Sequence, residues 1–172
     1  MSRPPHQAGD LARLLAQNER YAQDYDGSAP TAAPLAGLAI VACMDARLDV
    51  VAALGLQMGD AHIIRNAGGL ISDDVIRSLV VSQQLLGTHE VIVIEHTACG
   101  LHGADEDALR GLLAADRGIA TEDIDLGFGA FDDLEANLRA QVDVLRTHPL
   151  LREVPVHGLI FDVATGRLTE VT

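Results

Sequence analysis

Four short runs rich in apolar residues recur along the chain, and polar or glycine-containing segments separate them. The runs cover residues 38–42, 61–66, 91–94 and 156–163. Apolar runs of this length, bounded by turn-forming residues, are typical of strands buried in a sheet. Thr165 and Gly166 follow the last run and predict the turn of a terminal hairpin.

Between the runs, apolar residues return every three or four positions, which is the spacing of amphipathic helices. Ser72, Asp73 and Asp74 form a cluster of helix-capping residues, and Gly87 marks the end of the helix that they begin. The expected helices lie at residues 10–22, 48–56 (ending at Gly55 or Gly59), 72–86, 104–115 and 132–147. Strands that alternate with helices predict an α/β fold with a mostly parallel central β-sheet flanked by helices.

The first expected helix is set apart from the rest of the chain. Its apolar stripe consists of Leu11, Leu14, Leu15 and Ala22, and a stretch rich in glycine, proline and alanine follows at residues 26–37. Such a stretch is typical of a linker. We therefore divide the chain into an N-terminal helix and linker, residues 1–34, and an α/β domain, residues 35–172.

Composition limits the classes of function. Of the 172 residues, 48% are hydrophobic, the formal net charge is −13 and aromatic residues make up only 3%. A surface this acidic repels nucleic-acid phosphates, and few rings are available to stack on bases. No apolar run approaches the roughly 20 residues that span a bilayer, and the N-terminus lacks the apolar segment of a signal peptide. We expect a cytoplasmic protein that binds neither nucleic acid nor membrane.

Two short motifs directly follow predicted strands. Cys43, Asp45 and Arg47 come after the first strand, and His96 and Cys99 come after the third. Functional groups in α/β folds gather at the carboxyl ends of strands, so these side chains meet if the two strands are neighbours. Two thiolates and one imidazole suit zinc, and three protein ligands with an open fourth position are typical of a catalytic site. Arg47 has the donor geometry to hold Asp45 ionised and oriented.

The same residues have plainer interpretations. Composition alone is also consistent with two buried cysteines, or a disulfide between them, and with a histidine whose hydrogen bonds are satisfied. Asp45 and Arg47 are also consistent with an ordinary surface ion pair, which contributes little to stability. The segment 65–69 has the glycines of a phosphate-binding loop, but a lone pair of glycines usually marks a tight turn.

The two motifs resemble those of the β-class carbonic anhydrases, which read Cys-x-Asp-x-Arg and His-x-x-Cys-Gly. Here they are CMDAR at 43–47 and HTACG at 96–100. The similarity continues through RNAGG at 65–69, DDVIRSL at 73–79 and GLIFDVATGRL at 158–168, so it covers most of the chain from about residue 37 onward. The resemblance implies that Cys43, His96 and Cys99 bind Zn²⁺ and that Asp45 and Arg47 form a catalytic dyad. It also implies a closed form in which Asp45 becomes the fourth zinc ligand.

The function implied by this resemblance is the reversible hydration of carbon dioxide to bicarbonate. The nucleophile would be a zinc-bound hydroxide oriented by the Asp45–Arg47 dyad. The Gly100 amide is a candidate donor to a substrate oxygen, although glycine there could serve only the turn. The resemblance further implies a homodimer or a dimer of dimers, in which the N-terminal helix reaches over the partner.

Two other functions compete with this interpretation. A zinc hydrolase for carbonyl sulfide or carbon disulfide would use the same nucleophile on a similar electrophilic carbon. A non-catalytic zinc protein or redox regulator would have a saturated four-ligand site and no purpose for Arg47. His102 is a candidate proton shuttle, because histidine titrates near neutral pH, but an exposed loop histidine is the simpler interpretation.

Overall fold

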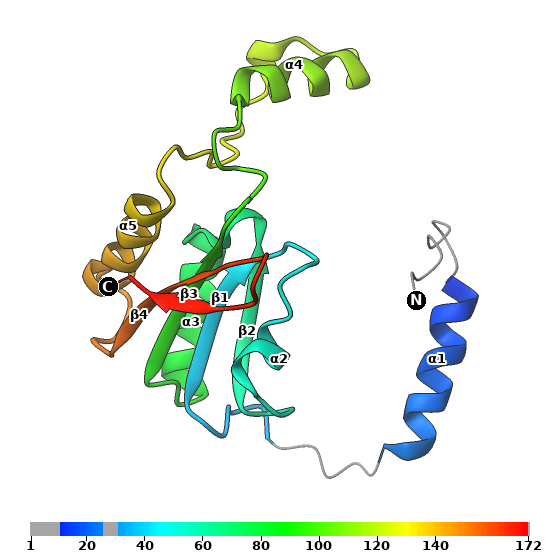
Figure 1. Ribbon diagram of the computed structural model, residues 1–172, viewed down its shortest axis with the longest axis vertical. Coiled ribbons are helices and arrows are strands. Elements are labelled where there is room, and N and C mark those ends of the chain that lie inside the picture. Colours follow the sequence, from blue (N-terminus) through cyan, green and yellow to red (C-terminus); the bar gives the residue numbers. More distant parts are fainter. Residues whose placement is uncertain (1–10, 26–30, 172) are drawn as a thin grey trace.

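The computed structural model of the chain describes residues 11–25 and 31–171 and contains one five-stranded sheet (Figure 1). The strand order is β2-β1-β3-β4-β5, with the first three pairings parallel and β4–β5 antiparallel. The strands are β1 (Leu38–Cys43), β2 (Ala61–Asn66), β3 (Glu90–His96), β4 (Val156–Phe161) and β5 (Leu168–Glu170). The mostly parallel sheet and the terminal hairpin are therefore confirmed. The last long strand ends at Phe161 and not at Val163.

The described residues also form five α-helices. They are α1 (Leu11–Asp24), α2 (Val50–Leu54), α3 (Asp73–Leu85), α4 (Glu106–Arg117) and α5 (Leu134–Thr147), with short 3₁₀ turns η1 (Ala67–Gly69) and η2 (Thr121–Asp123). α4 lies two residues later than the sequence predicts. Asp105 accepts hydrogen bonds from the first-turn amides of Asp107 and Ala108, and Gly118 ends the helix in a left-handed conformation.

The helix cap before α3 needs a correction. Ser72 alone is the N-cap residue, and its hydroxyl accepts from the amide of Val75. Asp73 and Asp74 occupy the first turn instead, where a carboxylate interacts favourably with the positive end of the helix dipole. Neither aspartate is therefore the cap that its position in the cluster suggests.

Two apolar clusters form the core, one on each face of the sheet. Along β3, Val91 and Val93 pack with α3 and α5, whereas Ile92 and Ile94 belong to the cluster that contains Leu48 and Val50 at the start of α2. Because side chains alternate along a strand, the next two residues are divided in the same way. Glu95 therefore lies on the α5 side, and His96 lies on the opposite side.

Two segments stand off from this core (Figure 1). No residue of α1 is buried, and Leu11, Leu14 and Leu15 are each more than half exposed. Residues 1–10 and 26–30 lie outside the described residues, so part of the expected N-terminal helix and linker lies there as well. The second segment carries α4 and leaves the sheet after β3; the amide of Gly103 donates to the carbonyl of Phe131 at its base.

In the described part of the chain, no helix combines the length and the apolar character needed to cross a membrane.

Candidate metal centre

The two sequence motifs meet at the carboxyl ends of adjacent strands. β1 and β3 pair directly and in parallel, Cys43 is the last residue of β1, and His96 is the last residue of β3. Cys99 follows in the turn after β3 and is also buried. One ligand atom from each of these three residues lies within 4.8 Å of the other two. The predicted meeting of the two motifs is therefore present in the fold.

The donor atoms of this cluster fit a metal ion. His96 Nδ1 lies 2.9 Å from the carbonyl oxygen of Thr97, which can only accept, so Nδ1 carries the proton and Nε2 presents a lone pair. Nε2 is buried and has no hydrogen-bond partner among the described residues. A buried polar nitrogen without a partner is costly, and a metal ion bound there removes that cost.

The two sulfur atoms support the same interpretation. Cys43 and Cys99 are free thiols, so a disulfide between them is excluded in this structure. Burial raises the pKa of the Cys99 thiol, which keeps it protonated when no cation is near. A cation with an affinity for sulfur would convert both groups to thiolates. Two thiolates and one imidazole form a donor set that suits zinc.

Asp45 and Arg47 form a bidentate ion pair beside this cluster. Arg47 Nε donates to Asp45 Oδ1 at 2.9 Å, and Arg47 Nη2 donates to Asp45 Oδ2 at 2.7 Å. The main-chain amide of Arg47 also donates to Oδ1, at 2.8 Å. These hydrogen bonds hold the pKa of Asp45 well below its usual range. Oδ2 lies 3.8 Å from His96 Nε2, so the charged carboxylate borders the three donor atoms.

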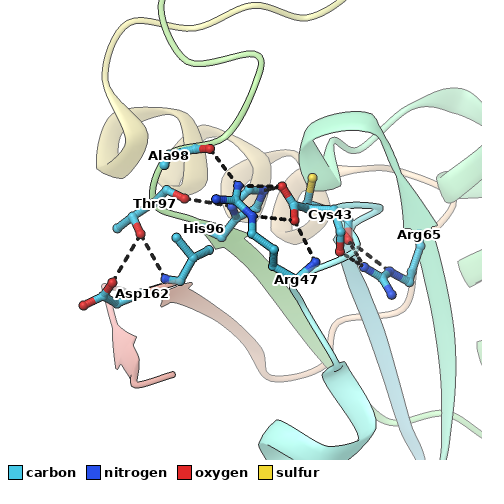
Figure 2. Close-up of polar contacts among 9 residues, drawn as sticks. Cys43, Arg47, Arg65, His96, Thr97, Ala98 and Asp162 are labelled. Atoms are coloured by element: carbon cyan, nitrogen blue, oxygen red, sulfur yellow. Dashed lines mark hydrogen bonds and ion pairs between the residues drawn. The ribbon is translucent and has the colours of Figure 1, made fainter. Parts of the chain in front are cut away.

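Arg47 also connects the two motifs. Its Nη2 atom donates to the carbonyl oxygen of Ala98 at 3.0 Å, and Ala98 lies between His96 and Cys99 (Figure 2). Ala98 has a φ of +53°, a left-handed conformation that residues with a side chain rarely adopt. An isolated surface ion pair needs neither this third contact nor this backbone strain. The arrangement is therefore more than the ordinary ion pair that the sequence also allowed.

The segment 65–69 packs directly against the main chain of Cys43. Arg65 donates to the carbonyl oxygens of Cys43 and Asp45. At Gly69, φ is +70°, and a Cβ atom would lie 3.0 Å from the main-chain nitrogen of Cys43 and from the carbonyl oxygen of Ile94. Glycine is therefore required for this close approach, and the segment supports the main chain of Cys43.

Sequence reasoning missed one contact at the site. The Thr97 hydroxyl accepts from the amide of Val163 at 3.1 Å and donates to Asp162 Oδ1 at 3.4 Å (Figure 2). These bonds tie the turn after His96 to the β4–β5 hairpin. Nothing in the spacing of Thr97 and Asp162, which are 65 positions apart, indicates that they meet.

The two weaker candidates occupy the same turn. A Cβ atom at Gly100 would meet nothing within 4 Å, and Gly100 is not among the residues with positive φ, so the turn itself does not require glycine. His102 is exposed, its ring stacks on Phe131 with centroids 5.5 Å apart, and its Nε2 lies 2.9 Å from the carbonyl oxygen of Asp132. His102 thus helps to close the base of the segment that carries α4.

Comparison with known proteins agrees with this geometry. Residues 38–168 match the protein family described as carbonic anhydrase. Beta-carbonic anhydrase 1 of Mycobacterium tuberculosis is 43% identical over 159 residues, which cover 92% of this chain and 95% of the relative. A carbon disulfide hydrolase of Acidithiobacillus thiooxidans is 39% identical over 148 residues, covering 75% of this chain and 74% of the relative.

Solved structures share the same fold. The carbonic anhydrase from Streptococcus mutans superposes with a TM-score of 0.88 at 39% identity, over 97% of this chain and 100% of that one. The β-carbonic anhydrase isoform I of Trichomonas vaginalis gives 0.85 at 31% identity, over 94% and 97% of the two chains. The α/β architecture, the family match over residues 38–168 and these relatives lead to one conclusion: this chain is an enzyme of the β-carbonic anhydrase family.

Proposed function

We propose that this enzyme catalyses the reversible hydration of carbon dioxide to bicarbonate, with Zn²⁺ held by Cys43, His96 and Cys99. When bound, zinc supplies a nucleophile at neutral pH, because it lowers the pKa of water from about 15.7 to about 7. The single observation that carries the proposal is the position of Asp45. Its carboxylate is engaged by Arg47 at the border of the three donor atoms, so it would leave a fourth position of a bound zinc ion available for the reaction.

Asp45 acts in this proposal as a fixed hydrogen-bond acceptor. Its depressed pKa keeps it charged throughout the neutral range, so it can accept a hydrogen bond from an O–H group without taking up the proton. Arg47 prevents the carboxylate from rotating, because the two side chains share two parallel hydrogen bonds. The Gly100 amide is proposed to donate to an oxygen of the substrate, and the absence of a Cβ atom leaves that space open.

A closed form is the second state that we propose for Asp45. In that form the carboxylate would leave Arg47 and take the fourth position on zinc, and the enzyme would be inactive. Low pH would favour this form, because an aspartate with an ordinary pKa of about 3.9 stays ionised below neutral pH, whereas hydroxide, the competing ligand, would be protonated to neutral water. Activity is therefore expected to rise with pH.

Hydrolysis of carbon disulfide is the alternative reaction, with carbonyl sulfide as a related substrate. The specific observation in its favour is the 39% identity to a carbon disulfide hydrolase. The same nucleophile would attack the same kind of linear, electrophilic molecule, and only the lining of the substrate pocket would differ. The higher identity and coverage of Beta-carbonic anhydrase 1 favour carbon dioxide.

One zinc-quantified preparation tests both reactions. Carbon dioxide hydration is followed by stopped flow with a pH indicator, and release of hydrogen sulfide from carbon disulfide and carbonyl sulfide is measured in parallel. Rapid carbon dioxide turnover with little sulfide release supports the proposal. Sulfide release by a fully zinc-loaded sample that leaves carbon dioxide untouched would transfer the assignment to the hydrolase. No turnover of any of the three would favour the non-catalytic regulator.

We propose that residues 1–34 form an arm that packs on a second copy of the chain in a homodimer, alone or within a dimer of dimers. The apolar stripe of α1 is exposed in the single chain. An apolar hollow of about 240 Å³ on the outer side of α3, lined partly by Ile64, Val81 and Leu86, offers a surface of matching character. Leu14→Glu and Val81→Glu should each convert the dimer to monomer in analytical ultracentrifugation, whereas dimers that persist in both variants would contradict this assembly.

We propose the cytoplasm as the site of action. Both cysteines are free thiols, and a reducing compartment preserves thiols for metal binding. Fractionation of cells that produce the native chain tests this, and recovery with exported proteins would contradict it.

A further inference from the structure

The main chain at the end of β1 carries both kinds of functional side chain in the centre. Cys43 supplies a sulfur donor and, two residues later, Asp45 supplies the carboxylate. Their separation depends on the conformation of Met44 and Asp45, which lie just beyond the end of the strand. Side chains in a metal centre must be held within about 0.5 Å of their working positions, so something must fix this loop.

Arg65 is placed to do so from the neighbouring strand. It lies on β2 opposite Ala42, one residue before the end of β1. Its Nε and Nη2 atoms donate to the carbonyl oxygen of Cys43 at 3.0 and 2.7 Å, and Nη2 also donates to the carbonyl oxygen of Asp45 at 2.7 Å (Figure 2). One guanidinium therefore holds the carbonyl groups on both sides of Met44.

The choice of partners is informative. Within residues 11–25 and 31–171, the Arg65 guanidinium donates to two main-chain carbonyls and forms no ion pair with a carboxylate. Arginine usually contributes to stability or recognition through carboxylates or phosphates, with which it forms paired hydrogen bonds. Here the planar fork bridges two points of one loop instead. Lysine cannot reproduce this, because its ammonium is a point charge without a fixed fork.

We propose that Arg65 is a positioning residue, whose guanidinium sets the distance between the Cys43 thiolate and the Asp45 carboxylate by clamping the main chain of the loop that carries both. The clamp acts together with Gly69, which contacts the amide side of Cys43, so the Cys43 main chain is held at its nitrogen and at its oxygen. Arg65 touches neither the metal nor the substrate in this role. The inference rests on the proposed zinc site but not on the identity of the substrate.

Four variants of this chain test the proposal. Arg65→Gln removes the charge and the fork, Arg65→Lys keeps the charge alone, Arg65→Ala leaves space for rescue by added guanidinium ion, and Arg139→Gln is the control. Arg139 is exposed on α5, where its Nη2 lies 3.8 Å from Glu135. Zinc affinity is measured by competition with a chromogenic chelator, and the geometry of the centre is followed by the visible absorption of the cobalt-substituted protein.

We expect Arg65→Gln to bind zinc about 10- to 100-fold more weakly, which is the usual effect of losing a residue that orients a metal ligand. Its cobalt spectrum should change, and kcat should fall while KM stays near the wild-type value. Arg65→Lys should resemble Arg65→Gln, and Arg139→Gln should resemble the wild type. Added guanidinium ion, at concentrations far below those that unfold the protein, should partly restore an Arg65→Ala variant.

Wild-type zinc affinity, cobalt spectrum and kcat in Arg65→Gln would overturn the proposal, and so would a fully functional Arg65→Lys. If Arg65→Gln does not fold, Arg65→Lys and the guanidinium rescue decide the matter. The metal measurements also separate this proposal from the proposed function. A wild-type enzyme that binds zinc but does not hydrate carbon dioxide would refute the function, while the zinc affinities would still judge the role of Arg65.

Discussion

The Arg47 guanidinium donates hydrogen bonds to both carboxylate oxygens of Asp45, at 2.9 and 2.7 Å, and to the carbonyl oxygen of Ala98 in the other motif. The relationship links the end of β1 to the turn after β3 through a single side chain. It also determines the state of the carboxylate, which is held charged at the border of the three metal-binding atoms. We therefore expect the active site to depend on Arg47 more than an exposed arginine normally implies.

Replacing Arg47 with Gln should release Asp45 toward the metal. The ordinary pKa of aspartate is about 3.9, so the carboxylate stays ionised at neutral pH even without its partner and becomes a stronger competitor for the fourth position. We expect kcat to fall by about 100-fold, zinc content to be retained, and the cobalt spectrum at pH 7 to shift toward that of the wild type at low pH. Arg117→Gln serves as the control, because Arg117 is exposed and forms an ion pair only with the exposed carboxylate of Asp116 among the contacts of the described residues. Wild-type turnover in Arg47→Gln would disprove the dyad.

Glu95 predicts a pH dependence of folding stability. It is 1% exposed, burial raises its pKa to about 7, and the hydrogen bond from Asn137 offsets only part of that effect. Between the ordinary value of 4.5 and about 7, the folded state therefore binds more protons than the unfolded state, and stability falls as pH rises. The loss across this window is on the order of 2 kcal/mol.

Urea unfolding of zinc-saturated protein at pH 5 and pH 8 measures this effect. Glu95→Gln should lose the decrease that the wild type shows between the two pH values, because glutamine does not titrate. Glu135→Gln, which changes an exposed carboxylate on α5, should keep the decrease. An equal decrease in the free energy of unfolding between pH 5 and pH 8 in the wild type and in Glu95→Gln would mean that Glu95 is not the group responsible.

Gly69 and Gly166 form a matched pair of glycine sites. Both have a left-handed φ, +70° and +73°, so alanine is strained at either position by about 1 to 2 kcal/mol. At Gly69 a Cβ atom would also press on the main chain of Cys43 and Ile94, whereas at Gly166 it would meet nothing within 4 Å. Gly69→Ala should lower the free energy of unfolding at least about twice as much as Gly166→Ala does, and it should weaken zinc binding. Equal decreases in the free energy of unfolding, with zinc affinity unchanged, would show that the main chain around Gly69 can shift to accommodate a Cβ atom.

The sequence predicted most of the fold because its signals are local. The apolar runs locate the strands, and the spacing of the two motifs places Cys43 and His96 at strand ends, which become neighbours in a parallel sheet. Helix boundaries are predicted less accurately. The sequence predicts that α4 begins at residue 104, but the helix begins after Asp105, because this one of several nearby acidic residues caps it.

The rest of the site depends on contacts between distant segments. Arg65 lies in a segment that looks like a tight turn, and only the pairing of β1 with β2 brings its guanidinium to the carbonyls of Cys43 and Asp45. Glu95 looks like the charged end of a strand, yet β3 continues through His96 and α5 covers the carboxylate with Asn137. Neither relationship leaves a trace in residue spacing, because each is produced by tertiary packing.

The central claim is that Cys43, His96 and Cys99 hold zinc while Asp45 makes it productive. The most direct test adds zinc back to chelator-treated wild type and Asp45→Asn while carbon dioxide hydration is followed from pH 6.5 to 9. We predict that both proteins take up one zinc per chain, that wild-type activity rises with zinc to that point and increases with pH, and that Asp45→Asn stays at least about 100-fold less active. Loss of zinc by Asp45→Asn, or a zinc-loaded wild type that leaves carbon dioxide untouched at every pH, would contradict the claim.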